Sequence, residues 1–374
     1  MESPVPHISF RSWLTMRAVL MATLAVGTLV TDRARAADPV PVYPEHQNLS
    51  YYLDADGRKQ PIKTQADWEI RRGHILANMQ VVMGPLPAAS KRVPLDVKVL
   101  ETVDLGGLER RKISYQTEAT DRVSAYLFLP ARTGDEKLPA VLCLHQTIAI
   151  GKEEPTGLGG NPNLHYALHL AKRGYVTLAP DYPSFGEHKY DFAEDKGYTS
   201  GTMKAIWDNM RAIDLLESLP AVAADRIGCI GHSLGGHNTM FTAAFDKRIK
   251  ALVSNCGFTR FHKYYEGKLV GWTSDRYMPK IRTVYENNPD KVPFDFPEIV
   301  AAFAPRAFLA SAPVRDNNFE VSGVVDTIAA AKPIYALYGV AYNLVANYPE
   351  SEHDFPENAR DVAYQFLDHQ LKRK

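Results

Sequence analysis

The sequence predicts an α/β protein whose mostly parallel sheet is covered by helices on both faces. From about residue 139 onward, short apolar runs alternate with stretches of helical periodicity, which is typical of parallel strands joined by crossover helices. The composition is that of a globular protein, with 45% hydrophobic and 23% charged residues among 374. A chain of this length can bury a large core.

Residues 37–94 are predicted to form an N-terminal arm and a helix that pack on the main domain. Residues 37–62 are rich in proline and tyrosine and have no steady period, so we expect an extended arm. Thr64 followed by Asp67 indicates a helix start, and Gly84 with the proline after it would end that helix. The apolar stripe of this helix comprises Trp68, Ile75, Leu76, Met79, Val82 and Met83.

Residues 95–374 form the predicted main domain. Residues 95–129 alternate in the strand manner around a Gly106-Gly107 turn, which predicts antiparallel strands at the start of the sheet. The later strands are predicted at 140–144, 175–179, 226–230, 251–254, 307–310 and 341–346, and the helices near 161–172, 202–218, 234–246, 322–333 and 357–371. Residues 258–303 show no clear strand, and we expect them to form a cap above the carboxyl ends of the strands.

Residues 1–36 have the pattern of an export signal. Arg11 and Arg17 flank an apolar run, 18–30, that is too short to span a bilayer comfortably. Residues 34–36, Ala-Arg-Ala, then offer the small side chains that a signal peptidase requires. The alternative is a membrane anchor that is never cleaved. With cleavage, the protein is expected in the periplasm or outside the cell, without stable membrane insertion.

Charge and cysteine content exclude several classes of protein. The 43 basic residues balance 43 acidic ones, so no nucleic-acid partner is expected. Three cysteines are too few for a disulfide scaffold or a four-cysteine zinc site. Cys143, Cys229 and Cys256 lie in apolar runs with strand character, and we expect all three to be free thiols in the core. The alternative is a disulfide between neighbouring strands, which needs a specific geometry.

The nucleophile is predicted at Ser233. The residues Gly231-His232-Ser233-Leu234-Gly235-Gly236 directly follow a predicted strand and open a predicted helix. This Gly-x-Ser-x-Gly pattern between strand and helix presents the serine on a strained turn at the top of the sheet. The glycines allow a turn that side chains would block.

A serine hydroxyl needs a base held in position by an acid. In this fold class the chain order is serine, acid, histidine, and each partner follows a strand. Asp316 and His353 both lie on loops after predicted strands and are the expected acid and base. The alternative acids are Glu320 and Asp354, and the alternative base is His369.

The oxyanion of the reaction needs two N–H donors. The backbone N–H of Leu234, just after the nucleophile, is the first expected donor. The second is expected from the loop after the strand ending at Leu144, where Thr147 is favoured and Gln146 is the alternative.

These motifs resemble the α/β-hydrolases of the dienelactone-hydrolase, acetyl-xylan-esterase and prolyl-oligopeptidase-like branch. The matching segments are 144–147 (Leu-His-Gln-Thr), 173–175, 179–182, 185–187 and 231–236, together with Asp316 and His353. The resemblance implies an eight-stranded sheet and a serine-hydrolase mechanism. It also implies that His145 braces its loop, and it places Gln146 where many relatives have glycine. The chain offers no β-propeller domain, and it has serine where dienelactone hydrolases tend to have cysteine.

Other candidate residues have structural explanations that we favour. His165 and His169 have a metal-capable spacing on a helix, but the apolar stripe around them favours packing. Asp181, at a strand end, is expected to fix the neighbouring loop, and 152–154 (Lys-Glu-Glu) to be a solvated loop. An aromatic binding wall, or simple packing of the cap, is expected from Tyr264, Tyr265, Trp272 and Tyr277.

Together these observations predict an exported serine hydrolase that cleaves carboxylic esters through an acyl-enzyme. The substrate is expected to be a small-molecule or carbohydrate ester, with no metal or organic cofactor. Two alternatives remain: a serine peptidase of the prolyl-oligopeptidase-like type with the same machinery, and a non-catalytic binding protein on a hydrolase scaffold.

Overall fold

The computed structural model describes residues 40–132, 134–192 and 197–372. The predicted export signal, residues 1–36, lies outside the described residues. Among the helices that are described, none has the length and apolar character needed to cross a bilayer.

The main sheet has nine strands, where the resemblance implied eight. Its strands, from one edge to the other, are β11 (Leu344–Asn347), β10 (Ala307–Ser311), β9 (Ile249–Asn255), β8 (Val222–His232), β6 (Leu138–Leu144), β7 (Val176–Pro180), β5 (Asp121–Pro130), β4 (Leu108–Glu118) and β3 (Lys98–Asp104). The additional strand is accounted for by the hairpin at Gly106-Gly107, which places the mostly exposed β3 on the edge of β4. The fold class is therefore confirmed, and the strand number is corrected.

The sheet is mixed. Strands β6 to β11 pair in parallel, whereas the pairs β3–β4, β4–β5 and β5–β7 are antiparallel. This confirms the antiparallel opening expected from residues 95–129. The predicted strand at 341–346 is shorter than expected, because a 3₁₀ turn occupies its first residues.

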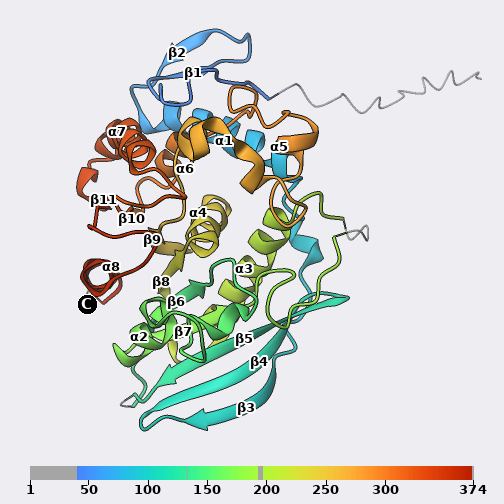
Figure 1. Ribbon diagram of the computed structural model, residues 1–374, viewed down its shortest axis with the longest axis vertical. Coiled ribbons are helices and arrows are strands. Elements are labelled where there is room, and N and C mark those ends of the chain that lie inside the picture. Colours follow the sequence, from blue (N-terminus) through green and yellow to red (C-terminus); the bar gives the residue numbers. More distant parts are fainter. Residues whose placement is uncertain (1–39, 133, 193–196, 373–374) are drawn as a thin grey trace, which may run out of the picture. The chain divides into compact units, whose positions relative to one another are not determined.

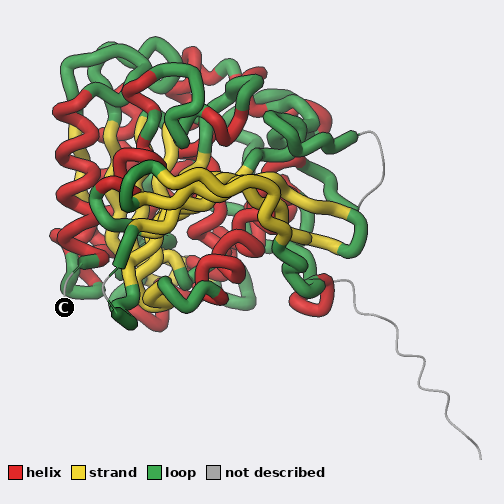
Figure 2. Tube along the Cα trace, turned by 90° about the horizontal axis from the view of Figure 1, so that it is seen from below, coloured by secondary structure: helices red, strands yellow, loops and turns green. Residues whose placement is uncertain are grey.

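Helices cover both faces of the sheet (Figures 1 and 2). The α-helices are α1 (Gln65–Met83), α2 (Tyr166–Lys172), α3 (Gly201–Ser218), α4 (Leu234–Phe245), α5 (Lys280–Thr283), α6 (Phe296–Ala301), α7 (Val321–Leu337) and α8 (Glu357–Leu371). The 3₁₀ helices are η1 (Ala89–Lys91), η2 (Gly151–Glu153), η3 (Pro162–Leu164), η4 (Phe261–Gly267), η5 (Leu269–Trp272) and η6 (Ala341–Asn343). The predicted helices thus all form, with α7 extending past its predicted end.

Alternation along the strands divides the core into two layers. On β6, Leu142 joins the larger apolar cluster, which includes residues of α1, α3, α4 and α7. Its neighbours Val141 and Cys143 join the other cluster, which includes residues of α2 and α8. Successive strand side chains point to opposite faces, so one apolar run supplies both layers. The three cysteines are buried and free, as predicted.

Residues 40–62 contact α1 and the segment before β10. A capping box of Thr64 and Asp67 begins α1, as the sequence predicted. Residues 40–62 contain a two-stranded antiparallel sheet, β1 (Tyr51–Leu53) and β2 (Lys59–Pro61), for which the sequence showed no period. From α1, buried Arg71 pairs with Glu298 of α6 at 2.6 Å.

Residues 258–303 contain η4, η5, α5 and α6 and no strand. Their aromatic side chains pack against one another, with tilted or edge-on ring contacts among Phe261, Trp272, Phe294 and Phe296. Part of this segment therefore packs as core, while other side chains of the segment reach the cavity described next.

Candidate active site

Ser233 occupies the sharp turn between β8 and α4. Its backbone has φ 53° and ψ −119°, a conformation that non-glycine residues rarely adopt. A Cβ at Gly231 would overlap the backbone of Gly235, and a Cβ at Gly235 would overlap the carbonyl oxygen of Leu144. The two glycines of the motif are required by these close approaches, and the strained turn of the sequence prediction is observed.

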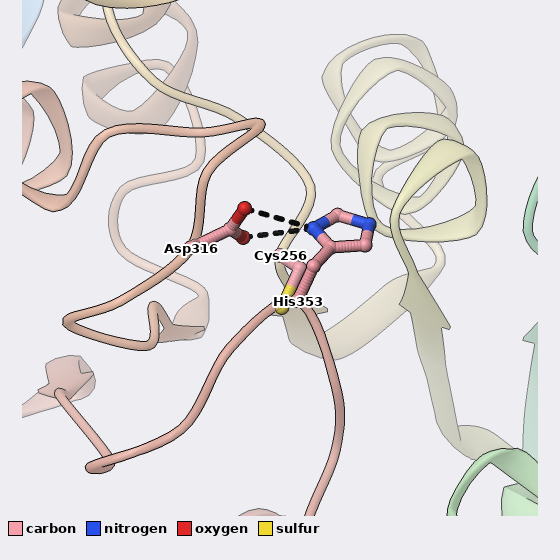
Figure 3. Close-up of side chains that lie close together, drawn as sticks. All are labelled: Cys256, Asp316 and His353. Carbon is pink, nitrogen blue, oxygen red and sulfur yellow. Dashed lines mark hydrogen bonds and ion pairs between the residues drawn. The ribbon is translucent and has the colours of Figure 1, made fainter.

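Asp316 and His353 lie together on the loops that follow β10 and β11 (Figure 3). His353 Nδ1 donates to both carboxylate oxygens of Asp316, at 2.9 and 3.0 Å. The backbone N–H groups of Asn318 and Phe319 also donate to Asp316, at 2.8 and 3.0 Å. Burial alone would raise the pKa of Asp316, but these hydrogen bonds hold it below its ordinary value. The carboxylate is therefore charged and oriented toward the ring.

The imidazole of His353 lies beside the turn that carries Ser233. Its ring centroid is 4.8 Å from that of His232, the residue before Ser233, and 5.9 Å from that of Phe319. Its second nitrogen faces away from Asp316 (Figure 3). Among the described residues, Ser233 Oγ makes no hydrogen bond to His353. Such bonds are often long without substrate and tighten in the reacting complex.

The two predicted oxyanion donors border the same cavity. Leu234 is the first residue of α4, where a backbone N–H has no acceptor within the helix. Thr147 also lines the cavity, and its hydroxyl lies 3.0 Å from that of Tyr277. The side chain of Gln146 instead donates to buried Glu154, at 2.8 Å, so it does not narrow the cavity.

His145 holds the backbone of this loop in place. Its Nδ1–H donates to the carbonyl oxygen of Gln146 at 2.6 Å, and its Nε2 accepts from the backbone N–H of Tyr182 at 2.9 Å. Because a backbone N–H can only donate, the proton of the neutral ring must be on Nδ1. Burial lowers the pKa of His145, which keeps the ring neutral. These contacts agree with the bracing role implied by the resemblance.

The cavity at Ser233 has a volume of about 120 Å³. The sequence analysis placed Ser233, Leu234 and Thr147 here, and all three line the cavity. Of the four residues named as a candidate aromatic wall, Tyr264, Trp272 and Tyr277 line it, whereas Tyr265 does not. Besides Gly271 of the 258–303 segment, the sequence analysis missed three further lining residues, His237, Asn318 and Phe319. His237 follows Ser233 by about one helical turn, and Asn318 and Phe319 closely follow Asp316. Their closeness in sequence to predicted site residues is the signal that could have found them. Burial lowers the pKa of His237 to about 3, and its ring is neutral.

The alternative acids and base have other surroundings. Asp354 accepts from the side-chain amides of Asn161 and Asn163, at 2.9 and 2.5 Å. Glu320 is the exposed residue before α7, and His369 is exposed on α8. None of the three shares the short contact that Asp316 makes with His353.

The expectation of a solvated loop at residues 152–154 is wrong. Lys152 is 1% exposed and Glu154 2% exposed. Lys152 Nζ lies 2.7 Å from Asp181 and 2.8 Å from Glu187, and its backbone N–H also donates to Asp181. The carboxylate of Asp181 accepts from the backbone N–H of Glu187 at 2.9 Å and so fixes its neighbouring loop, as predicted. Its buried ion pair with Lys152, which also holds the 152–154 loop, was not predicted. Local sequence did not reveal the pair, because its members come from separate segments.

Removal of the Lys152 ammonium is expected to destabilise the protein strongly. Lys152→Met leaves Asp181 buried and unpaired, which should cost about 3–5 kcal/mol of unfolding free energy. The matched control is Lys291→Met, which removes an exposed pair with Glu286 and should cost at most about 1 kcal/mol. Urea unfolding measures both. The double variant Lys152→Met/Asp181→Asn should recover part of the loss, and equal stabilities for Lys152→Met and Lys291→Met would contradict a paired buried charge.

Two side-chain groups in the described part of the chain bring metal-capable donors together. One is Cys256 with Asp316 and His353 (Figure 3). Burial, together with the nearby charge of Asp316, raises the pKa of the Cys256 thiol well above its ordinary value. The other is Asp121, His188 and Asp208, where Lys204 pairs with both carboxylates. The protonated thiol and the resident ammonium make both sets poor cation sites.

His165, the N-cap residue of α2, and His169, within α2, pack rather than converging on a common point. His165 Nε2 is 3.0 Å from the carbonyl oxygen of Gly159, and His169 Nδ1 is 3.0 Å from the hydroxyl of Tyr364. Burial lowers the pKa of His169 to about 4. This confirms the packing interpretation.

A serine on a strained strand–helix turn, followed in chain order by a paired acid and histidine on later strand loops, defines the α/β-hydrolase class, to which this protein belongs. A sequence model of the prolyl oligopeptidase family matches residues 163–373, more than half of the chain. The chain belongs to the prolyl oligopeptidase family.

Individual relatives are distant. The chain is 32% identical over 165 residues to uncharacterized protein PA2218 of Pseudomonas aeruginosa, covering 44% of this chain but only 39% of that protein. It is 23% identical to 4-O-methyl-glucuronoyl methylesterase 1 of Wolfiporia cocos, covering 91% of this chain and 85% of that one. A glucuronoyl esterase structure from Solibacter usitatus superposes with a TM-score of 0.67 and 20% identity, covering 88% of this chain and 99% of the other. This last likeness confirms the fold.

Proposed function

We propose that the protein is a serine hydrolase of carboxylic esters, with Ser233 as nucleophile, His353 as base and Asp316 as acid. His353 would take the proton of Ser233 as its oxygen attacks the ester carbonyl, and would then pass it to the leaving alcohol. Asp316 would hold the ring tautomer and stabilise the imidazolium. The N–H groups of Leu234 and Thr147, with Gln146 as the alternative, would bind the oxyanion, and water would cleave the acyl-enzyme.

The observation that carries this proposal is the contact of His353 Nδ1 with both oxygens of Asp316, beside the strained turn at Ser233. That contact leaves the second ring nitrogen available for the serine. The esterases among the similar proteins support ester hydrolysis over peptide hydrolysis. Two of them are named as glucuronoyl esterases, and these names support a substrate in which the ester is attached to a sugar. We further propose that residues 1–36 direct export and are removed, leaving residues 37–94 and the hydrolase domain, 95–374, with its 258–303 cap.

An ester panel tests the reaction class. The purified protein is expected to hydrolyse 4-nitrophenyl acetate, acetylated xylan or a glucuronate methyl ester, and to leave amino-acid 4-nitroanilides uncleaved. Rates are measured by absorbance or by acid release, with a feruloyl ester and longer acyl esters included. Cleavage of the anilides without cleavage of any ester would favour the peptidase. No turnover, together with no labelling of Ser233 by a fluorophosphonate, would favour the binding protein.

A further inference from the structure

A groove outside the catalytic cavity is lined by Tyr264, Gly271 and the exposed side chain of Tyr265. The cavity at Ser233 holds about 120 Å³, whereas this groove holds about 560 Å³. Pockets that bind small molecules usually enclose about 300–1,000 Å³. The cavity alone is below that range, so a substrate larger than a simple ester must extend beyond it.

The groove and the cavity share walls. Both are lined by Tyr264 and Gly271. The hydroxyl of Tyr265 donates to Asn318 Oδ1 at 3.0 Å, and Asn318 lines the cavity. A substrate could therefore occupy both spaces at once, with its reacting bond at Ser233.

A series of aromatic rings connects the groove to the catalytic histidine. Tyr265 meets Tyr264 edge-on at 4.8 Å, Tyr264 lies 5.6 Å from Phe319, and Phe319 lies 5.9 Å from His353. The outermost ring, that of Tyr265, is 50% exposed. This ring presents an exposed apolar surface beside the site. By contrast, most of the other aromatic side chains of the 258–303 segment are buried.

The backbone that presents Tyr265 is strained. Tyr265 has φ 44° and Glu266 has φ 58°, both in the left-handed region that non-glycine residues avoid. Strain of this kind is frequent at ligand-binding segments. Glu266 and Lys268 add charged groups to the rim of the groove, so hydroxyl-bearing ligands would find hydrogen-bond partners beside the ring.

We propose that this groove binds a pyranose ring, stacked on Tyr265, while the small remainder of the ester occupies the cavity at Ser233. One face of a pyranose carries axial C–H groups, which pack against the electron-rich face of an aromatic ring. The small remainder is either an acetyl group on a sugar hydroxyl or the methoxy group of a uronate methyl ester, which leaves as methanol when the enzyme is acylated. This proposal rests on the proposed function and specifies its substrate class.

The test compares substrates that differ only outside the cavity. For wild type and Tyr265→Ala, kcat/KM is measured on an acetylated xylo-oligosaccharide, a glucuronate methyl ester, 4-nitrophenyl acetate and 4-nitrophenyl decanoate. The ratio of sugar-ester to aryl-acetate kcat/KM should fall about three- to tenfold in Tyr265→Ala, mainly through KM. The sugar ester whose kcat/KM ratio falls shows whether the substrate is an acetylated sugar or a uronate methyl ester. Tyr265→Phe should restore the ratio, since it keeps the ring.

The matched control is Tyr342→Ala, which removes a 72% exposed tyrosine away from the site and should leave the ratio unchanged. The sugar assignment would be overturned if Tyr265→Ala left the ratio of sugar-ester to aryl-acetate kcat/KM unchanged. It would also be overturned if the substitution lowered kcat/KM only for 4-nitrophenyl decanoate. Both outcomes require active wild-type enzyme. Failure of the proposed function would instead appear as absence of ester hydrolysis in the wild type.

Discussion

Ser233→Ala is expected to lower kcat for 4-nitrophenyl acetate by several orders of magnitude, roughly 10⁶-fold. The serine oxygen is the atom that would form the acyl-enzyme, and alanine leaves only the oxyanion donors and substrate binding. The turn at φ 53° does not depend on the hydroxyl, so the variant should fold with a melting temperature close to that of the wild type. Stopped and continuous assays of the purified variant measure the effect.

The control for this substitution is Ser322→Ala, which removes the hydroxyl of Ser322 in α7 from its contact with Glu320. It should retain full activity and should still be labelled by a fluorophosphonate, whereas Ser233→Ala should lose the label. If Ser233→Ala retained activity close to that of the wild type, the nucleophile assignment and the ester-hydrolase proposal would both fail.

Asp316→Asn is expected to give the second largest loss, about 10⁴-fold in kcat. An asparagine oxygen can still accept from the N–H groups of Asn318 and Phe319. Its amide nitrogen would then face His353 Nδ1 and donate to it. The ring proton would move to the nitrogen that must accept from Ser233, so the base would be in the wrong tautomer.

Asp354→Asn is the matched control, because Asp354 adjoins His353 in the chain and was one of the two alternative acids. Its carboxylate accepts from Asn161 and Asn163 and not from the imidazole. Activity is therefore expected to stay within a few-fold of the wild type. A large loss in Asp354→Asn combined with a small loss in Asp316→Asn would transfer the role of the acid to Asp354. Burst kinetics on 4-nitrophenyl acetate would show whether acylation or deacylation is slowed.

Both predictions depend on two energetically costly features of the site, the strained backbone at Ser233 and the buried charge of Asp316. Ser233 stays in an unfavourable backbone conformation because Gly231 and Gly235 allow close packing against β6. Asp316 keeps its charge although its side chain is 1% exposed, because three N–H donors surround it. The backbone strain at Ser233 and the desolvation of Asp316 are thus offset by neighbouring contacts, as is common in active sites.

The features that the sequence by itself determined are those encoded over a few neighbouring residues. Strand and helix periods gave the alternation from β6 to α8, the Thr64–Asp67 pattern gave the start of α1, and the glycines around Ser233 gave the turn. The positions of Asp316 and His353 also followed, because parallel strands end at one edge of a sheet and their loops gather there. Their mutual contact was therefore predictable from chain order.

Only the tertiary structure decided which distant side chains meet. The burial of Lys152 depends on Asp181 and Glu187, which lie on another loop. The cavity walls at Tyr264 and Asn318 come from two segments that share no sequence period with Ser233. Periodicity records which face of an element is apolar, but it does not record which partner covers that face. Burial, ion pairing and the shape of the cavity arise from long-range packing, so they appear only when the segments are folded together.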